Sequence, residues 1–213
     1  MRNIKISSGE YYHIFNRGVN KQIVFHDKSD YLRFLFLILY FQSDLTFNPL
    51  GRFVKAFTRT SFLDEAVDVA NKRNVELIAF CILSNHFHLI VKEVDDNGIA
   101  RYMQRILNSY TKYYNTKYEK SGHLFQGPYQ AVHISDNRQL LYLSTYIHKN
   151  PANWSLYQWS SYRDFVGKNK WGALLMPEII TEQFKGGSEY KTFIKTSLAK
   201  EFKEELDPWN SKC

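Results

Sequence analysis

The amino-acid sequence predicts an α+β fold in which helices pack on an antiparallel sheet. An apolar, β-prone run over residues 75–83 is followed by Ser84-Asn85 and a second such run, 86–91, which together predict a hairpin. Stretches with apolar residues at helical spacing lie on both sides of this hairpin. The chain of 213 residues is 44% hydrophobic and 23% charged, which is ordinary for a globular protein and sufficient to bury a core.

The first 60 residues are expected to form a strand, a buried helix and an insertion. Residues 10–18 are rich in aromatic side chains and end in a glycine, which predicts a strand running into a turn. Asp27 or Ser29 can cap a helix from about residue 31 to 41, which is apolar nearly all round. Residues 42–60 lose this pattern and are interpreted as an inserted loop or lid that contacts nucleic acid, with a surface hairpin as the alternative.

The remaining elements alternate between helix and strand. Helical spacing returns over residues 62–73 and, after the hairpin, over 99–118, where Asp95-Asp96-Asn97-Gly98 is the expected capping turn. A strand over 129–134 precedes a helix that Ser135 or Asp136 can cap and that Pro151 stops after Asn150. The tail contains a Gly186-Gly187 link and an amphipathic stretch over 190–206, which predict a small helical appendage.

The hairpin carries two histidines that point the same way. Alternate side chains of a strand lie on one face, so His86 and His88 project together while Phe87 points into the opposite packing layer. Two imidazoles on one strand face make half of a metal site. An isolated His-x-His pattern is more often structural, but two polar rings inside a hairpin need a partner.

The helix that ends at Asn150 offers the remaining groups of such a site. Tyr146 and Asn150 lie one turn apart on one face, so packing across the sheet from the histidines would add a hydroxyl and an amide oxygen. His148 lies about 200° round the helix from Tyr146 and is left out of the site.

Charge indicates a polyanionic partner. Lys and Arg number 28 against 21 Asp and Glu, which gives a formal charge of +7. On the helix over 99–118, one face carries Arg101, Arg105 and Lys112, which fits a phosphate backbone or equally a solvated face. Together with Arg17 they are the predicted DNA contacts. No Gly-rich phosphate loop occurs, which argues against a nucleotide-driven enzyme.

The cellular setting is inferred from what the sequence lacks. Cys81 and Cys213 are its only cysteines, so no disulfide framework is expected. The N-terminus has no signal-peptide core, and the most apolar run, residues 34–41, is too short to cross a bilayer. We therefore predict a cytoplasmic, nucleoid-associated protein that does not enter a membrane.

Several motifs in order resemble one known family. His86-Phe87-His88, preceded by Asn85, is similar to the His-hydrophobe-His signature of the HUH endonucleases. The run from Tyr146 to Pro151 resembles the tyrosine motif of their single-tyrosine transposase branch, in particular the REP-associated tyrosine transposases. Residues 11–18, 122–127 and 159–162 resemble further family elements, so the likeness extends over roughly residues 11–193.

The resemblance implies a fold, a site and an activity. It implies a sheet of ferredoxin-like or RNA-recognition-like topology in a domain over residues 1–165, followed by a helical extension over 166–213. By the same resemblance, His86, His88 and Asn150 would bind Mg²⁺ or Mn²⁺, and Tyr146 would be the nucleophile. The expected activity is cleavage and joining of single-stranded DNA at hairpin-flanked sites, through a 5′-phosphotyrosine intermediate.

Two features of the sequence depart from the family pattern, and two other functions are alternatives. Pro128 stands where the family commonly has a basic residue, and the segment 42–60 is longer than the usual connection. A hairpin-binding protein without turnover, and a metal phosphoesterase that uses water, are the alternative functions. The sequence leaves open whether the site is built within one chain or across a homodimer.

Overall fold

The structure is a computed structural model that describes residues 5–57 and 63–197. Its four strands form one sheet in the order β2-β3-β1-β4, and every neighbouring pair is antiparallel. The strands are β1 (Tyr11–Arg17), β2 (Val75–Ile82), β3 (His86–Glu93) and β4 (Gln130–Ile134). With α1 (Lys28–Tyr40) between β1 and β2, and α4 (Gly98–Lys117) between β3 and β4, this is the ferredoxin-like arrangement. The predicted α+β class and antiparallel sheet are thus confirmed.

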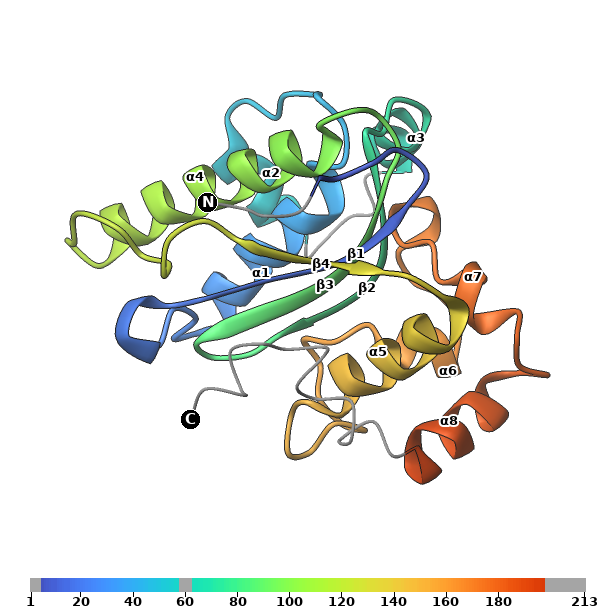
Figure 1. Ribbon diagram of the computed structural model, residues 1–213. Coiled ribbons are helices and arrows are strands. Elements are labelled where there is room, and N and C mark those ends of the chain that lie inside the picture. The colour runs from blue at the N-terminus through green and yellow to red at the C-terminus, as the bar shows by residue number, and fades with distance from the viewer. Residues whose placement is uncertain (1–4, 58–62, 198–213) are drawn as a thin grey trace.

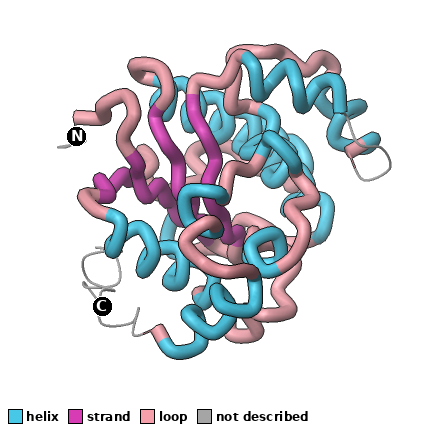
Figure 2. Tube along the Cα trace, turned by 90° about the vertical axis from the view of Figure 1, so that its right-hand side faces the viewer, coloured by secondary structure: helices cyan, strands magenta, loops and turns pink. Residues whose placement is uncertain are grey.

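Helices cover both faces of the sheet. α1 and α4 lie on one face, and α5 (Asn137–Lys149), α6 (Tyr162–Val166) and α8 (Gly187–Thr196) lie on the other (Figure 1). Figure 2 shows the strands side by side among the helices. The shorter elements are the 3-10 helices Val19–Lys21 and Gly172–Leu174 and the helices α2 (Leu50–Ala56), α3 (Leu63–Asn71) and α7 (Glu178–Thr181). In the described part of the chain, no helix is long and apolar enough to span a membrane.

The alternation of side chains along the strands produces two separate cores. On β1, Tyr12 and Ile14 point into the core under α1 and α4. On β3, Phe87 joins that core, whereas Ile90 belongs to the core that α5 and α8 cover. Residues of opposite parity therefore face opposite layers, as the period of two requires. The histidines of β3 share the parity of Ile90 and so lie on the α5 side.

Two of the helix starts agree with the predicted caps and one does not. The Asp27 side chain caps α1 in a capping box with Asp30, and Asp136 caps α5 by accepting from the Gln139 amide. At α4 no residue of the predicted turn provides a side-chain cap. Instead the carboxylate of Glu93, at the end of β3, accepts from the backbone N–H groups of the first two helical residues, Gly98 and Ile99.

The described part of the segment 42–60, residues 42–57, packs on α1. The sequence predicts a loop or lid here, with a surface hairpin as the alternative, but part of the segment forms α2. The reason is aromatic packing: Phe47, Phe53 and Phe57 make ring contacts with one another or with Phe36 and Tyr40 of α1. The segment thus belongs to the layer of α1, on the face of the sheet opposite α5. Residues 58–60 lie outside the described residues.

The C-terminal helix is part of the second core. α8 begins at Gly187 and ends at Thr196, whereas the sequence predicted a helix over 190–206. The end of that predicted helix falls outside the described residues. Tyr190 and Ile194 of α8 are fully buried with side chains of α5 and α6. The division of the chain at about residue 165 stays a prediction.

Candidate functional site

The two histidines of β3 lie on the sheet face that α5 covers. His88 is fully buried and His86 is partly buried, at the end of the strand where β3 begins. Their ring centroids are 5.1 Å apart and the ring planes are perpendicular. Phe87 between them points into the opposite core, as the strand period predicts. Burial lowers the pKa of His88 well below its usual value, and the neighbouring His86 and His13 lower it further, so this imidazole is neutral at pH 7.

Tyr146 reaches this pair from α5. Its ring meets the ring of His88 edge-on, with centroids 5.6 Å apart and planes at 83°. Tyr146 is almost fully buried, which places its hydroxyl-bearing ring against the sheet. Residues 58 positions apart in the chain are thus brought together because α5 packs over β2 and β3. All of these groups come from a single chain.

A third histidine joins the group, and the sequence interpretation gave it no role. His13 on β1 is fully buried, and its Nε2 lies 2.9 Å from Nδ1 of His88. Its ring stacks on Phe15 and approaches Tyr146 edge-on at 6.4 Å. The period of a strand puts His13 on the face opposite Tyr12 and Ile14, an inference that the sequence interpretation did not draw. What the pattern lacked was the register, which pairs Phe15 with His88 and so brings His13 within reach.

The turn before β3 holds the other histidine. The side-chain oxygen of Asn85 lies 2.6 Å from Nδ1 of His86, and its Nδ2 donates to the carbonyl oxygen of Lys21 at 3.1 Å. The Asn85 carbonyl oxygen accepts from the amide of Gly18 at 2.8 Å. The hairpin turn is therefore bound to Gly18, which follows β1, and to Lys21 in the 3-10 helix after it.

One nitrogen atom at this site is suited to bind a divalent cation. Nε2 of His88 is buried and has no hydrogen-bond partner within the described ranges, so it is a polar atom that a cation would satisfy. Among the described residues, no three His, Cys, Asp or Glu side chains form a group that could hold a metal ion. The metal ligands predicted from the sequence are His86, His88 and Asn150, and the amide of Asn150 is not one of these four side-chain types. Mg²⁺ and Mn²⁺ often bind few protein atoms and complete their shell with water and substrate phosphate oxygens.

Asn150 follows the last residue of α5. It is partly exposed, has α-helical backbone angles and stands one turn after Tyr146, before Pro151. Its amide donates to the carbonyl oxygen of Ile147. The structure leaves its predicted role as a ligand a prediction, as it does for His86 and His88.

The opposite side of α5 is anchored by a buried polar network. His148 lies between two hydroxyl groups: its Nδ1 is 2.8 Å from the Tyr190 oxygen and its Nε2 is 2.8 Å from Oγ of Ser161. The Tyr190 hydroxyl also donates to Ser144. His148 thus faces α6 and α8, whereas Tyr146 faces β3. This agrees with the prediction that leaves His148 out of the site. This network fixes the rotation of α5 about its own axis and hence the direction of Tyr146.

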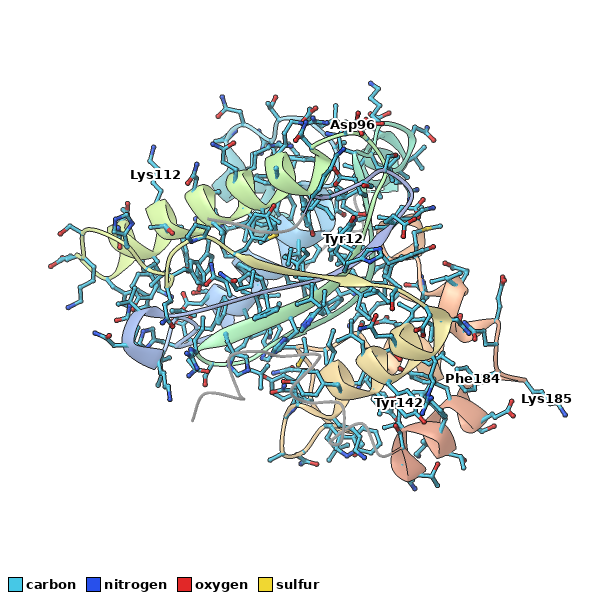
Figure 3. All side chains as sticks on the ribbon, viewed as in Figure 1. Tyr12, Asp96, Lys112, Tyr142, Phe184 and Lys185 are labelled. Atoms are coloured by element: carbon cyan, nitrogen blue, oxygen red, sulfur yellow. The ribbon has the colours of Figure 1, made fainter. Side chains whose placement is uncertain are left out.

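The four residues predicted to contact DNA differ in the hydrogen bonds and ion pairs that they make within the protein. Arg17 pairs with His86 in the sheet register and donates to the Gln126 side chain at 3.3 Å. Arg101 and Arg105 both approach Asp44, and Arg105 also donates to the carbonyl oxygens of Ser43 and Leu45. Lys112 is exposed and points away from α4 into solvent (Figure 3). Their role in binding DNA stays a prediction.

Comparisons with known proteins add a family and a fold. Residues 52–150, which include Tyr146 and the histidines of β3, match the family model described as "Transposase IS200 like". The fold is similar to a solved structure described as the REP-associated tyrosine transposase bound to a REP hairpin. The TM-score is 0.52 at 14% sequence identity, over 84% of this chain and 92% of that chain. No curated protein sequence matches the chain.

Proposed function

Because residues 52–150 match the model of the IS200-like transposase family, we propose that this chain cleaves and rejoins single-stranded DNA with Tyr146 as the nucleophile. The observation that carries the proposal is the edge-on contact of Tyr146 with His88, at 5.6 Å between ring centroids. It places the ring of Tyr146 against one of the two imidazoles that share a strand face. That a single chain supplies all three residues supports a site built within one protomer.

The proposed reaction is a transfer of the DNA 5′-phosphate to tyrosine. The deprotonated Tyr146 oxygen attacks phosphorus and forms an oxygen–phosphorus bond. The bond between phosphorus and the 3′ oxygen of the preceding nucleotide breaks. The leaving oxygen takes up a proton and becomes a 3′-OH. Attack of a 3′-OH on the phosphotyrosine reverses these steps, so a strand is rejoined without ATP.

The neighbours of Tyr146 support this role by orientation. The buried rings of His88 and His13 hold the Tyr146 ring edge-on, and the network around His148 holds the helix that carries it. When bound by His86, His88 and Asn150, Mg²⁺ or Mn²⁺ would act as a Lewis acid on the scissile phosphate. A neutral His88 suits this function, because its lone pair is available at pH 7.

The proposed substrate is a single strand beside a hairpin. The solved structure of similar fold is described as bound to a REP hairpin, which supports this choice of nucleic acid. Within this chain, Arg17 stands beside His86 in the sheet and so would contact DNA close to the cleavage point. Lys112 on the outer face of α4 would contact the phosphate backbone farther away.

The experiment uses 5′- and 3′-labelled single strands from the regions that flank the gene. Each is incubated with protein and Mg²⁺ or Mn²⁺ and resolved on a denaturing gel. Wild type should give a slow-migrating covalent adduct that requires the metal, and Tyr146→Phe should give none. Tyr142→Phe is the matched control, because Tyr142 lies one turn earlier on α5 beside α8 and should leave the adduct unchanged (Figure 3).

The other outcomes separate the alternatives. Cleavage that survives Tyr146→Phe would indicate a water nucleophile and a phosphoesterase. Binding of hairpin DNA without cleavage, on every flank and with either metal, would indicate a binding protein without turnover. Loss of the adduct in His86→Ala, with DNA binding retained, would support the proposed ligand.

A further inference from the structure

We propose that Asn85 and His13 are positioning residues that fix the protonation of His86 and His88, so that each ring presents the lone pair of its Nε2. This inference rests on the proposed function, because it concerns the two proposed metal ligands. Each ring has its Nδ1 within hydrogen-bond distance of one neighbour. The Asn85 oxygen lies 2.6 Å from His86 Nδ1, and His13 Nε2 lies 2.9 Å from His88 Nδ1.

The Asn85 contact determines the tautomer of His86. Nδ2 of Asn85 donates to the carbonyl oxygen of Lys21, and a carbonyl oxygen only accepts, so the Asn85 oxygen is the atom that faces His86. That amide oxygen is also only an acceptor. Nδ1 of His86 must therefore carry the proton, and in the neutral imidazole the lone pair lies on Nε2. The bond from Gly18 N–H to the Asn85 carbonyl oxygen keeps the turn in this geometry.

The contact with His13 determines the tautomer of His88, the buried one of the two proposed ligands. Nε2 of His88 has no partner in the described part of the chain, so a proton there would leave a buried N–H without an acceptor. With the proton on Nδ1, His88 donates to His13 Nε2 and keeps its own Nε2 lone pair for a cation. His13 is fully buried and stacked on Phe15 at 4.6 Å, so the acceptor is held in place.

The two contacts perform the same task from different elements. Metal-ligating histidines almost always donate their second ring N–H to a neighbouring acceptor, which fixes the tautomer and the ring orientation. Here the turn supplies the acceptor for His86, and the adjacent strand supplies the acceptor for His88. Removing either acceptor is expected to weaken metal binding about 10- to 100-fold, because the wrong tautomer places a proton on the binding nitrogen.

The test reads the tautomers directly in the metal-free protein. Long-range ¹H–¹⁵N NMR of the ring nitrogens of labelled wild-type protein should show both His86 and His88 protonated on Nδ1. Asn85→Ala should shift His86 toward the form protonated on Nε2, whereas Asn85→Asp keeps an acceptor oxygen and should retain the native form. His13→Phe should have the same effect on His88, and His13→Gln, whose amide oxygen can accept, should restore it.

A second measurement connects the tautomers to the metal. Mn²⁺ binding followed by electron paramagnetic resonance should weaken about 10- to 100-fold in Asn85→Ala and His13→Phe and recover in Asn85→Asp and His13→Gln. Circular dichroism of each variant checks that it is folded. The recovery by Asn85→Asp separates the acceptor role from the bond to Lys21, which that variant also loses.

The results that would overturn the inference differ from those that would overturn the function. Either ring protonated on Nε2 in the wild type rejects the assignment without any variant. Unchanged Mn²⁺ affinity in folded Asn85→Ala or His13→Phe rejects the positioning role of that residue. A wild type with both rings protonated on Nδ1 that binds no Mn²⁺ contradicts the proposed metal-dependent function and leaves the tautomer assignment standing.

Discussion

Nζ of Lys117, at the end of α4, donates to Oδ1 of Asp30, at the start of α1, across 2.7 Å. Asp30 is fully buried, and it also accepts from the hydroxyl groups of Tyr113 and Tyr118. Burial alone would raise the pKa of Asp30, but the hydrogen bonds from Lys117 and Tyr118 outweigh it and hold the pKa below its usual value. The two helices that cover one face of the sheet are thus joined through one buried carboxylate.

Lys117→Met should lower the free energy of unfolding at pH 7 by about 3 kcal/mol, because it leaves a buried carboxylate without its cation. Urea denaturation measures this change. Lys112→Met, on the exposed side of the same helix, is the control and should change stability by less than about 0.5 kcal/mol. Adding Asp30→Asn to Lys117→Met should recover part of the loss. A double variant no more stable than Lys117→Met would contradict the pairing.

Acid should destabilise the protein through His148. Burial lowers the pKa of His148 from 6.5 to about 3, so the folded state keeps this ring neutral where the unfolded chain takes up a proton. Between pH 6.5 and 3 the unfolded state binds more protons, so stability falls as the pH falls, and this group alone should cost about 2 kcal/mol at pH 5. His148→Gln should lack this component. Urea denaturation at pH 8 and pH 5 compares the two proteins, and equal losses would contradict the assignment.

Two variants of Tyr146 should separate the role of its hydroxyl group in DNA cleavage from the role of its ring in packing. Tyr146→Phe keeps the ring that meets His88, so the free energy of unfolding should stay within about 1 kcal/mol of wild type while the DNA adduct is lost. Tyr146→Ala removes a nearly buried aromatic ring and should cost about 3 kcal/mol. Thermal unfolding of both variants tests the difference. A Tyr146→Phe protein as unstable as Tyr146→Ala would mean that the hydroxyl group holds the helix in place.

Two basic residues of the predicted DNA-binding stripe should behave differently. Arg105 donates to two backbone carbonyl groups and stacks on Phe41, so Arg105→Ala should cost about 2 kcal/mol of stability. Lys112→Ala should leave stability unchanged but weaken DNA binding and reduce the slope of log affinity against log salt by about 1. Fluorescence anisotropy at several salt concentrations measures the slope. An unchanged slope for Lys112→Ala would remove this residue from the DNA surface.

Spacing along the chain was a good guide wherever the deciding contacts were local. The Ser84-Asn85 turn, the buried Phe87 and the capping of α1 and α5 by Asp27 and Asp136 all follow from neighbours within a few residues. The errors occurred where a group outside the segment being interpreted decided its structure. Glu93 caps α4 because β3 ends beneath the start of that helix, and the segment 42–60 forms α2 because α1 offers it an aromatic surface.

In the candidate site too, some features follow from local spacing and others from tertiary packing. The periods of strand and helix are local properties of the backbone, so they sufficed to place His86 with His88, Tyr146 with Asn150, and His148 elsewhere. The meeting of Tyr146 with His88, and the entry of His13 beside His88, depended on strand register and on the rotation of α5. Those are set by the packing of whole layers and by hydrogen bonds between residues far apart in the chain. No short-range pattern contains that information.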